Sequence, residues 1–184
     1  MHFKPDKAVP FHEAFNEKGK SHWVHFYIDD YRFECVWDNP KPYLIFLKRL
    51  GGVITPDYSV CRDFPLTMQM WNTYRNRVLA YWLQVNGANI VPNISWSDER
   101  TYDFAFEGIA RGGTVSVSTN GCIKDPIDRH YFKQGFAKMI DKLSPDTVIC
   151  YSQCPDDIFG EYREAGLEII NIENHWETVR KAAK

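Results

Sequence analysis

The chain has 184 residues, of which 44% are hydrophobic and 25% are charged, and its formal net charge is -2. This length and composition suit one globular domain with a substantial core. Lys and Arg are scattered along the chain, so we predict no basic footprint for duplex DNA. No segment has the ~20 apolar residues of a membrane span, and the N-terminus lacks a secretory signal. These patterns favour a cytoplasmic protein without a membrane partner.

The five cysteines are odd in number and dispersed, which is typical of reduced thiols rather than of a disulfide framework. Cys122, Cys150 and Cys154 follow or end predicted strands, but they form no C-x-x-C pair and have no regularly spaced histidine. We therefore predict no metal site there, and interpret these cysteines as buried, unreactive thiols.

Residues 1–21 are polar and contain two prolines and a glycine, so we predict an irregular N-terminal arm before a single α/β domain over 22–184. The first predicted elements are a strand over 24–28, a second strand or ordered loop over 31–37, a helix from Pro40 to the pair Gly51-Gly52, and a strand over 52–56.

The longest predicted helix begins at Pro65 and ends near Val85. Its apolar residues recur at steps of three and four, a spacing that predicts a stripe facing the core. The residues of this stripe are Met68, Trp71, Tyr74, Val78, Tyr81, Trp82 and Val85.

Strands and helices continue to alternate through the second half of the chain. We predict strands over 89–95, 114–119, 147–152 and 168–173, and helices over 127–143, 157–166 and 175–183. About six alternating βα units predict an α/β fold with a mostly parallel sheet. We favour a small or incomplete (β/α)-barrel-like arrangement, and an open doubly wound sheet is the alternative.

Polar residues follow most of the predicted strands, at the edge where parallel α/β folds bind ligands. The candidate catalytic carboxylates are Asp29, Asp30, Asp57 and Asp98, and the candidate ligand-binding residues beside them are Tyr58, Ser95, Trp96 and Asn120. Paired carboxylates serve as acid, base or nucleophile in glycosidic-bond chemistry, while aromatic rings stack on sugars and bases.

Two other interpretations of these carboxylates stay open. An Asp after a strand is a common helix cap or turn former, and a set of such residues then only braces loops. Asp29, Asp30 and Asp57 are alternatively oxygen ligands for a divalent cation, although their spacing matches no dedicated metal loop. No cofactor-binding motif is present, because both the G-x-G-x-x-G fingerprint and the P-loop are missing.

Arg75 and Arg77 lie on the long predicted helix, where they are candidates for contact with an anionic ligand. Solvated helix surface or an internal salt bridge is the more common role of such residues.

Four segments taken together identify a resemblance: FYIDDYRFECVW, GGVITPDYSVCRDFPLTMQMWNTYRNR, IVPNISWSD and FEGIARGGTVSVSTNGC. They resemble a family of uncharacterised proteins, a domain of unknown function found in bacteria and in their phages and mobile elements. The resemblance covers roughly residues 22–155. It implies a phage or mobile-element context and no particular activity.

Two functional hypotheses follow. The first is an enzyme that acts on a sugar, nucleoside or nucleotide through the strand-end carboxylates. The second is a non-catalytic accessory module that binds a host protein, a small nucleotide or single-stranded nucleic acid, with aromatic residues as anchors.

Overall fold

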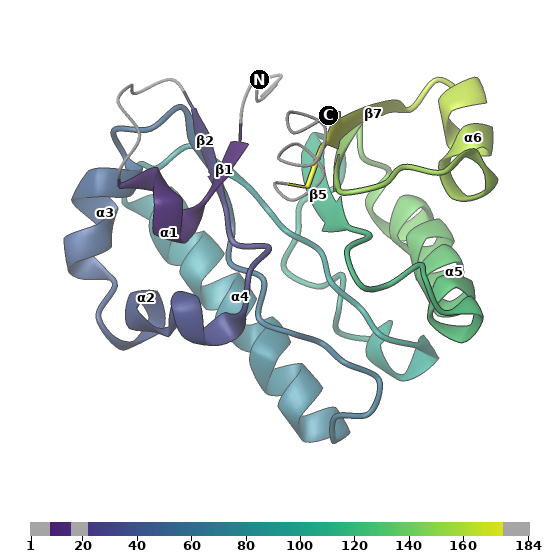
Figure 1. Ribbon diagram of the computed structural model, residues 1–184, viewed down its shortest axis with the longest axis horizontal. Coiled ribbons are helices and arrows are strands. Elements are labelled where there is room, and N and C mark those ends of the chain that lie inside the picture. Colours follow the sequence, from purple (N-terminus) through teal and green to yellow (C-terminus); the bar gives the residue numbers. More distant parts are fainter. Residues whose placement is uncertain (1–7, 16–21, 175–184) are drawn as a thin grey trace, which may run out of the picture.

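A computed structural model describes residues 8–15 and 22–174, and Figure 1 shows their arrangement. The fold is α/β, with two parallel sheets and helices between the strands. The first sheet contains β1 (Ala8–Pro10), β2 (Trp23–His25), β3 (Gly52–Ile54) and β4 (Ile90–Val91), and the second contains β5 (Thr114–Ser118), β6 (Thr147–Tyr151) and β7 (Glu168–Ile172). The helices are α1 (Phe11–Ala14), α2 (Glu34–Asp38), α3 (Lys41–Leu47), α4 (Leu66–Val85), α5 (Pro126–Leu143) and α6 (Asp156–Glu164), with 3₁₀ turns η1 (Asp30–Arg32) and η2 (Glu99–Thr101).

The strands of each sheet lie side by side in chain order. A bridge between Asn93 and Ser116 connects the two sheets, since β4 pairs with β3 and the chain just beyond it then meets β5. This sequential order differs from the reversed order of a doubly wound sheet. Within the described residues β1 and β7 do not pair, so no closed barrel forms.

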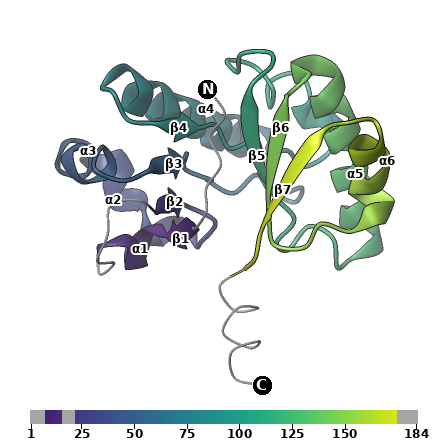
Figure 2. The same cartoon turned by 90° about the horizontal axis from the view of Figure 1, so that it is seen from above.

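The two sheets face each other, and the helices cover their outer sides (Figure 2). One hydrophobic cluster contains residues of both sheets, among them Trp23, Ile54 and Ile149. Alternation along each strand produces both faces. On β2 and just beyond it, Trp23 and Tyr27 point inward, whereas Val24 and Phe26 pack against the outer helices. Both faces are therefore buried, as is usual for parallel sheets.

Two expectations for the N-terminal third of the chain were wrong. The first 21 residues contain β1 and α1, with Phe11 and Ala14 buried, rather than only an irregular arm. Pro10 is compatible with β1 because this strand lies at the sheet edge, where a missing N–H costs no ladder bond. The segment over 31–37 forms η1 and α2 instead of a strand or an ordered loop.

Most later elements are confirmed within two residues, including α4, α5, β5 and β6, whereas α3 ends three residues before the predicted boundary. The predicted strand over 89–95 is shorter, because β4 ends before Pro92. A 3₁₀ turn and irregular turns, rather than a helix, connect β4 to β5. The helix predicted over 175–183 lies outside the described residues.

Helix α4 is oriented opposite to the prediction. Trp71, Tyr74 and Tyr81 of the expected core stripe are 48%, 55% and 68% exposed. Met68 and Val85 are exposed as well. The buried side of α4 is instead mostly polar, and consists of Gln69, Asn72, Thr73, Asn76, Leu79, Ala80 and Leu83.

The polar side of α4 is buried because it satisfies backbone groups of neighbouring loops. Asn76 accepts a hydrogen bond from the Tyr58 backbone N–H at 2.8 Å and donates one to its carbonyl at 3.3 Å. Asn72 donates to the Ser59 carbonyl, and Gln69 donates to the Phe64 carbonyl. Buried loop backbone requires such partners, and helix α4 provides them for the segment between β3 and α4.

Replacement of Asn76 tests this explanation. Asn76→Ala should lower the free energy of unfolding by about 1–3 kcal/mol, because it leaves the buried N–H and C=O of Tyr58 without partners. Urea denaturation followed by circular dichroism measures the change. The exposed Gln84→Ala on the same helix is the control and should change stability by about 0.5 kcal/mol or less. Equal effects of the two substitutions would contradict the assigned role of Asn76.

Candidate functional site

A cavity of about 560 Å³ opens at the carboxyl ends of the strands. Its walls come from both sheets, with Tyr27 beyond β2, Asp57 beyond β3, Ser118 on β5 and Tyr151 on β6. A second cavity of about 260 Å³ shares Asp57, Ser59, Ser118 and Asn120 with the first. Asp57 therefore lies at the junction of the two cavities, at the edge where the sequence predicted a site.

The Asp57 carboxylate is held by a network that spans both sheets. Its Oδ1 atom accepts hydrogen bonds from Ser95 Oγ at 2.5 Å and Asn93 Nδ2 at 2.7 Å. Asn93 Oδ1 in turn accepts from the Tyr27 hydroxyl, which lies 2.6 Å from Ser116 Oγ. Among the described residues, the hydrogen bonds to Asp57 all reach Oδ1, which leaves Oδ2 for a ligand.

Burial raises the pKa of Asp57 from 3.8 to about 6, because a charged carboxylate loses hydration there. The hydrogen bonds from Ser95 and Asn93 partly oppose this shift, and the negative charge of Asp30 adds to it. A carboxyl group that titrates near pH 6 can both accept and donate a proton near neutrality. The pKa of Tyr27 is raised as well, first by burial and then by the charge of Asp57.

The structure separates the neighbouring carboxylates Asp29 and Asp30. Asp29 is exposed, lines the larger cavity and contacts Arg32 at 3.3 Å. Asp30 accepts hydrogen bonds from both the backbone N–H and the hydroxyl of Ser59. Asp29 thus lies at the site, whereas Asp30 braces the loop that carries Ser59.

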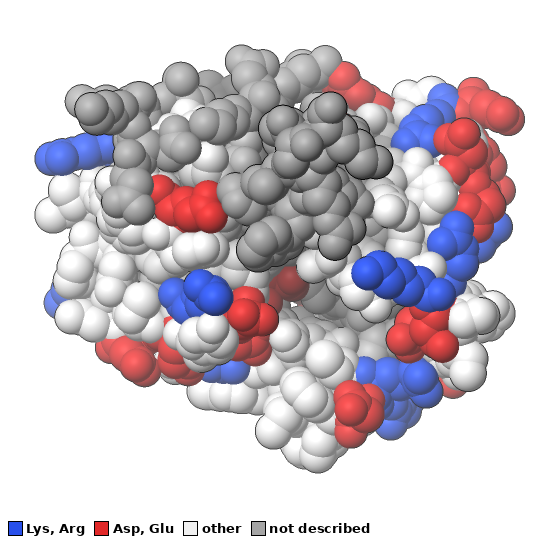
Figure 3. Space-filling view, in the orientation of Figure 1, with Lys and Arg blue, Asp and Glu red and all other residues white. Residues whose placement is uncertain are grey.

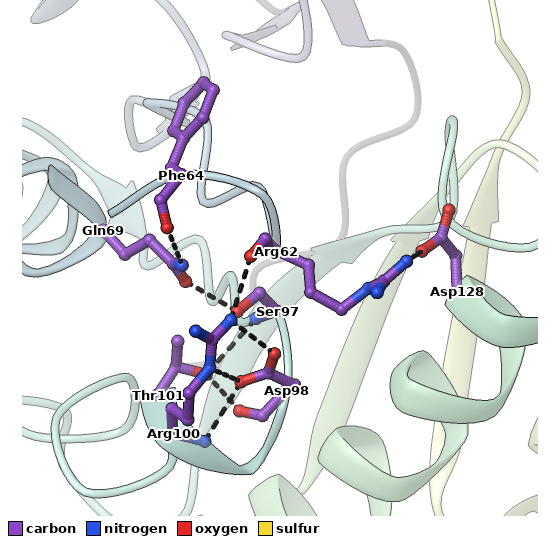
Figure 4. A network of polar contacts seen from close by, with 8 residues as sticks. All are labelled: Arg62, Phe64, Gln69, Ser97, Asp98, Arg100, Thr101 and Asp128. Atoms are coloured by element: carbon purple, nitrogen blue, oxygen red, sulfur yellow. Dashed lines mark hydrogen bonds and ion pairs between the residues drawn. The ribbon is translucent and has the colours of Figure 1, made fainter. Parts of the chain in front are cut away.

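Asp98 lies in a separate network that Figure 4 shows in close-up. Its side chain caps η2 by accepting from the Arg100 backbone N–H, and its carboxylate pairs with the Arg100 guanidinium at 2.8 Å. The hydrogen bond from Arg100 lowers the pKa of Asp98. Ser97 links the same segment to Gln69 of α4. Asp98 lines neither of the two cavities that Asp57 joins, and its contacts are those of a cap.

Three proposed ligand-binding residues also have internal partners. The Tyr58 ring is fully buried in the core, beneath the Arg75 guanidinium at 3.5 Å from the ring centre. Arg75 pairs with Glu34 at 2.8 Å. Arg77 donates to the backbone carbonyls of Glu107, Asn93 and Ala105. These side chains hold loops together in this structure rather than lining the cavities.

Ser95, Trp96 and Asn120 do lie at the site. All three line the smaller cavity, and Asn120 also lines the larger one. The Trp96 indole packs so closely on Gly135 of α5 that a Cβ atom at residue 135 would overlap the ring. Glycine at this position therefore lets Trp96 fold against α5 beside the cavity.

Several cavity residues were not predicted from the sequence. Tyr27 and Tyr151 come from strand segments that read as purely apolar core, and their rings stack at 4.8 Å between centres. Their alternation with Phe26 and Cys150 was the available signal, since it places both tyrosines on the inward face. The larger cavity is also lined by His12, Glu13, Arg32, Ser118 and Asn174.

Of the three cysteines predicted to be buried, Cys150 is buried, whereas Cys122 and Cys154 are half-buried. Burial raises the pKa of Cys122 to about 12. Cys154 is half-buried, and a hydrogen bond with the Cys150 thiol lowers its pKa. The Cys154 thiol is therefore the more acidic of this pair.

Within residues 8–15 and 22–174, no three His, Cys, Asp or Glu side chains gather as a metal site. The cation alternative for Asp29, Asp30 and Asp57 stays a prediction. Figure 3 shows a face hollowed near its centre, on which acidic and basic side chains are interspersed. No helix in the described part of the chain is long and apolar enough to span a bilayer.

Comparison with known proteins defines the class. The model of the family described as Domain of unknown function (DUF4417) matches residues 1–173, so the chain belongs to that family. The chain is 38% identical over 145 residues to the Gene 1 protein of Mycobacterium phage L5, covering 77% of this chain and 63% of the relative. It is 37% identical over 145 residues to the Gene 1 protein of Mycobacterium phage D29, covering 77% and 53%.

The chain thus spans less than two thirds of these phage relatives. No solved structure matches it. The resemblance to an uncharacterised family with phage members is confirmed.

The environment of Asp57 predicts a pH-dependent stability difference. Asp57→Asn should raise the free energy of unfolding by about 1–3 kcal/mol at pH 7–8, because it removes a carboxylate that is costly to ionise when folded. The folded pKa near 6 exceeds the unfolded value, so wild-type stability falls as pH rises from about 4 to 6. The gain should therefore vanish below about pH 4. Urea denaturation across this pH range measures it.

Asp98→Asn is the matched control with the opposite sign. It should lower stability at neutral pH by about 0.5–2 kcal/mol, because it removes a cap and an ion pair. The pKa of Asp98 is lowered in the folded wild type. The stability difference between wild type and Asp98→Asn should therefore disappear as the pH falls through this lowered pKa. Destabilisation by both substitutions at pH 7 would contradict the assignment of Asp57.

Proposed function

We propose that this phage-related protein is an enzyme that binds a sugar, nucleoside or nucleotide in the carboxyl-end cavity, with Asp57 as general acid or base. The observation that carries the proposal is the pKa of about 6 for a carboxyl group that lines the cavity and is held through its Oδ1 atom. Such a pKa matches proton transfer near neutral pH.

The cavity walls support a polyhydroxylated ligand. Ser59, Ser118 and Asn120 offer hydroxyl and amide groups around Asp57, and Tyr27 and Tyr151 add aromatic surface. This combination of hydroxyl and amide groups with aromatic rings suits a sugar or a base. Asp29 on the same wall is the candidate second carboxylate, since glycosidic-bond chemistry uses a pair.

A non-catalytic module for a small nucleotide is the second candidate. Arg32 lines the same cavity, which favours a ligand with a phosphate group. This alternative uses the same residues for binding and requires no proton transfer by Asp57.

A thermal-shift panel of sugars, nucleosides and nucleotides tests the proposal. A ligand at ~100 times its Kd should stabilise the protein by about 2.7 kcal/mol, which shifts the melting temperature by several degrees. The shift should persist in the exposed Asp103→Asn control and be lost in Asp57→Asn. An unchanged shift in Asp57→Asn would contradict a role for Asp57 in binding.

Turnover of the binding ligand then separates the two candidates. An enzyme should show a pH profile with an inflection near 6 that disappears in Asp57→Asn. Activity should rise through this pH if Asp57 is the base, and fall if it is the acid. Binding without any turnover would favour the nucleotide-binding module instead.

A further inference from the structure

The outward side of α4 carries apolar side chains that the described fold covers only in part. Six of these residues are exposed, and half-buried Val78 lies between them. We call this set the α4 outer face: Met68, Met70, Trp71, Tyr74, Val78, Tyr81 and Val85. In Figure 2, α4 runs along the outside of the β1–β4 half, and no other helix lies over its outer flank. The site described above lies at the strand ends, so this surface is distinct from it.

The α4 outer face has the spacing of a helix-pairing seam. Trp71, Tyr74, Val78, Tyr81 and Val85 follow one another at steps of three, four, three and four. This average of 3.5 residues is the heptad repeat that keeps one side of a helix against a partner helix. The opposite side of α4 is already buried against the protein, so the seam is available to pair with a second helix.

The area of the face suits a stable interface. An aromatic side chain that becomes fully buried covers about 150–250 Å², so six large side chains that are about half exposed offer roughly 600–700 Å². This exceeds the largest apolar patch of a typical monomer, about 300–600 Å². It approaches the ~800 Å² per partner of standard-size interfaces.

The charges around the face favour a second copy of this chain. Arg75 and Arg77 are the only charged residues of α4, and both are bound internally, to Glu34 and to backbone carbonyls. The seam itself is therefore uncharged and compatible with its own copy. An antiparallel pair also aligns opposite ends of the two helix dipoles.

Antiparallel pairing also brings opposite charges together at both ends. With the two-fold axis at Val78, Trp71 lies seven residues from the axis, about 10 Å, opposite the partner's Val85. Trp37 packs on Trp71 at 5.5 Å between ring centres, and exposed Asp38 follows it. The amino group of exposed Lys48 lies beside Gly87, just past the other end of α4. In an antiparallel pair, Asp38 of one copy therefore lies at the same end of the interface as Lys48 of the other copy.

We propose that the α4 outer face is the interface of an antiparallel homodimer of this chain, centred on Val78. The face is continuous, uncharged and large enough, and the pairing matches Asp38 with Lys48. Because a two-fold axis repeats every contact, each favourable pair occurs twice.

Sedimentation velocity of the full chain from about 1 to 100 µM tests the proposal. The wild type should sediment as a dimer, and Tyr74→Glu and Tyr81→Glu should each weaken dimerisation at least tenfold with unchanged circular dichroism. Ile127→Glu is the matched control, because Ile127 is 56% exposed on α5, and it should leave the dimer intact. A wild type that stays monomeric, or a dimer that survives both Glu substitutions, would overturn the proposal.

A charge exchange tests the orientation. Asp38→Lys should weaken the dimer several-fold, and the addition of Lys48→Asp should restore it, since the pair then meets with reversed signs. A double variant no tighter than Asp38→Lys would overturn the antiparallel arrangement, because parallel helices keep these residues at opposite ends.

Discussion

The buried side chain of Asn93 connects the parts of this protein that its candidate site depends on. Its amide donates to Asp57 and Ser95, and its oxygen accepts from Tyr27. Its backbone N–H donates to Thr55, and its carbonyl accepts from Arg77. The residue is fully buried, so the loss of one of these hydrogen bonds would leave a polar group without water as a substitute. The same residue forms the bridge to Ser116 between the two sheets. The contact between the two sheets and the placement of the Asp57 carboxylate therefore depend on the same residue.

Helix α4 illustrates a second constraint, the need of buried loop backbone for partners. The loop after β3 must carry Asp57 to the cavity, and this irregular backbone needs hydrogen bonds that no strand supplies. Asn72 and Asn76 of α4 provide them, which requires the polar side of the helix to face inward. The apolar side is then left at the surface. The candidate site and the proposed interface thus arise from opposite sides of one helix.

Two of the four candidate aspartates stabilise local structure, and the other two line the cavity. Asp30 accepts hydrogen bonds from the loop residue Ser59, and Asp98 accepts one as the cap of η2, whereas Asp57 and Asp29 line the cavity. The four aspartates that the sequence analysis grouped together therefore have different environments in the fold. Burial raises the pKa of Asp57, whereas the hydrogen bond from Arg100 lowers the pKa of Asp98. The two carboxyl groups therefore titrate at different pH values.

The sequence by itself determined the alternation of strands and helices, the parallel sheets and the edge where the polar residues gather. These features follow from local patterns, since apolar runs, prolines and glycines mark elements within a few residues. The candidate residues Asp57, Ser95, Trp96 and Asn120 were found this way. Only the tertiary structure decided which side of α4 is buried, because the helical period is the same whichever side packs inward. Only it distinguished Asp57 from Asp98, because the pKa and the partners of a carboxylate depend on residues distant in the chain. The inward position of Tyr27 and Tyr151 likewise became evident once the two sheets faced each other, since both faces of these strands are buried.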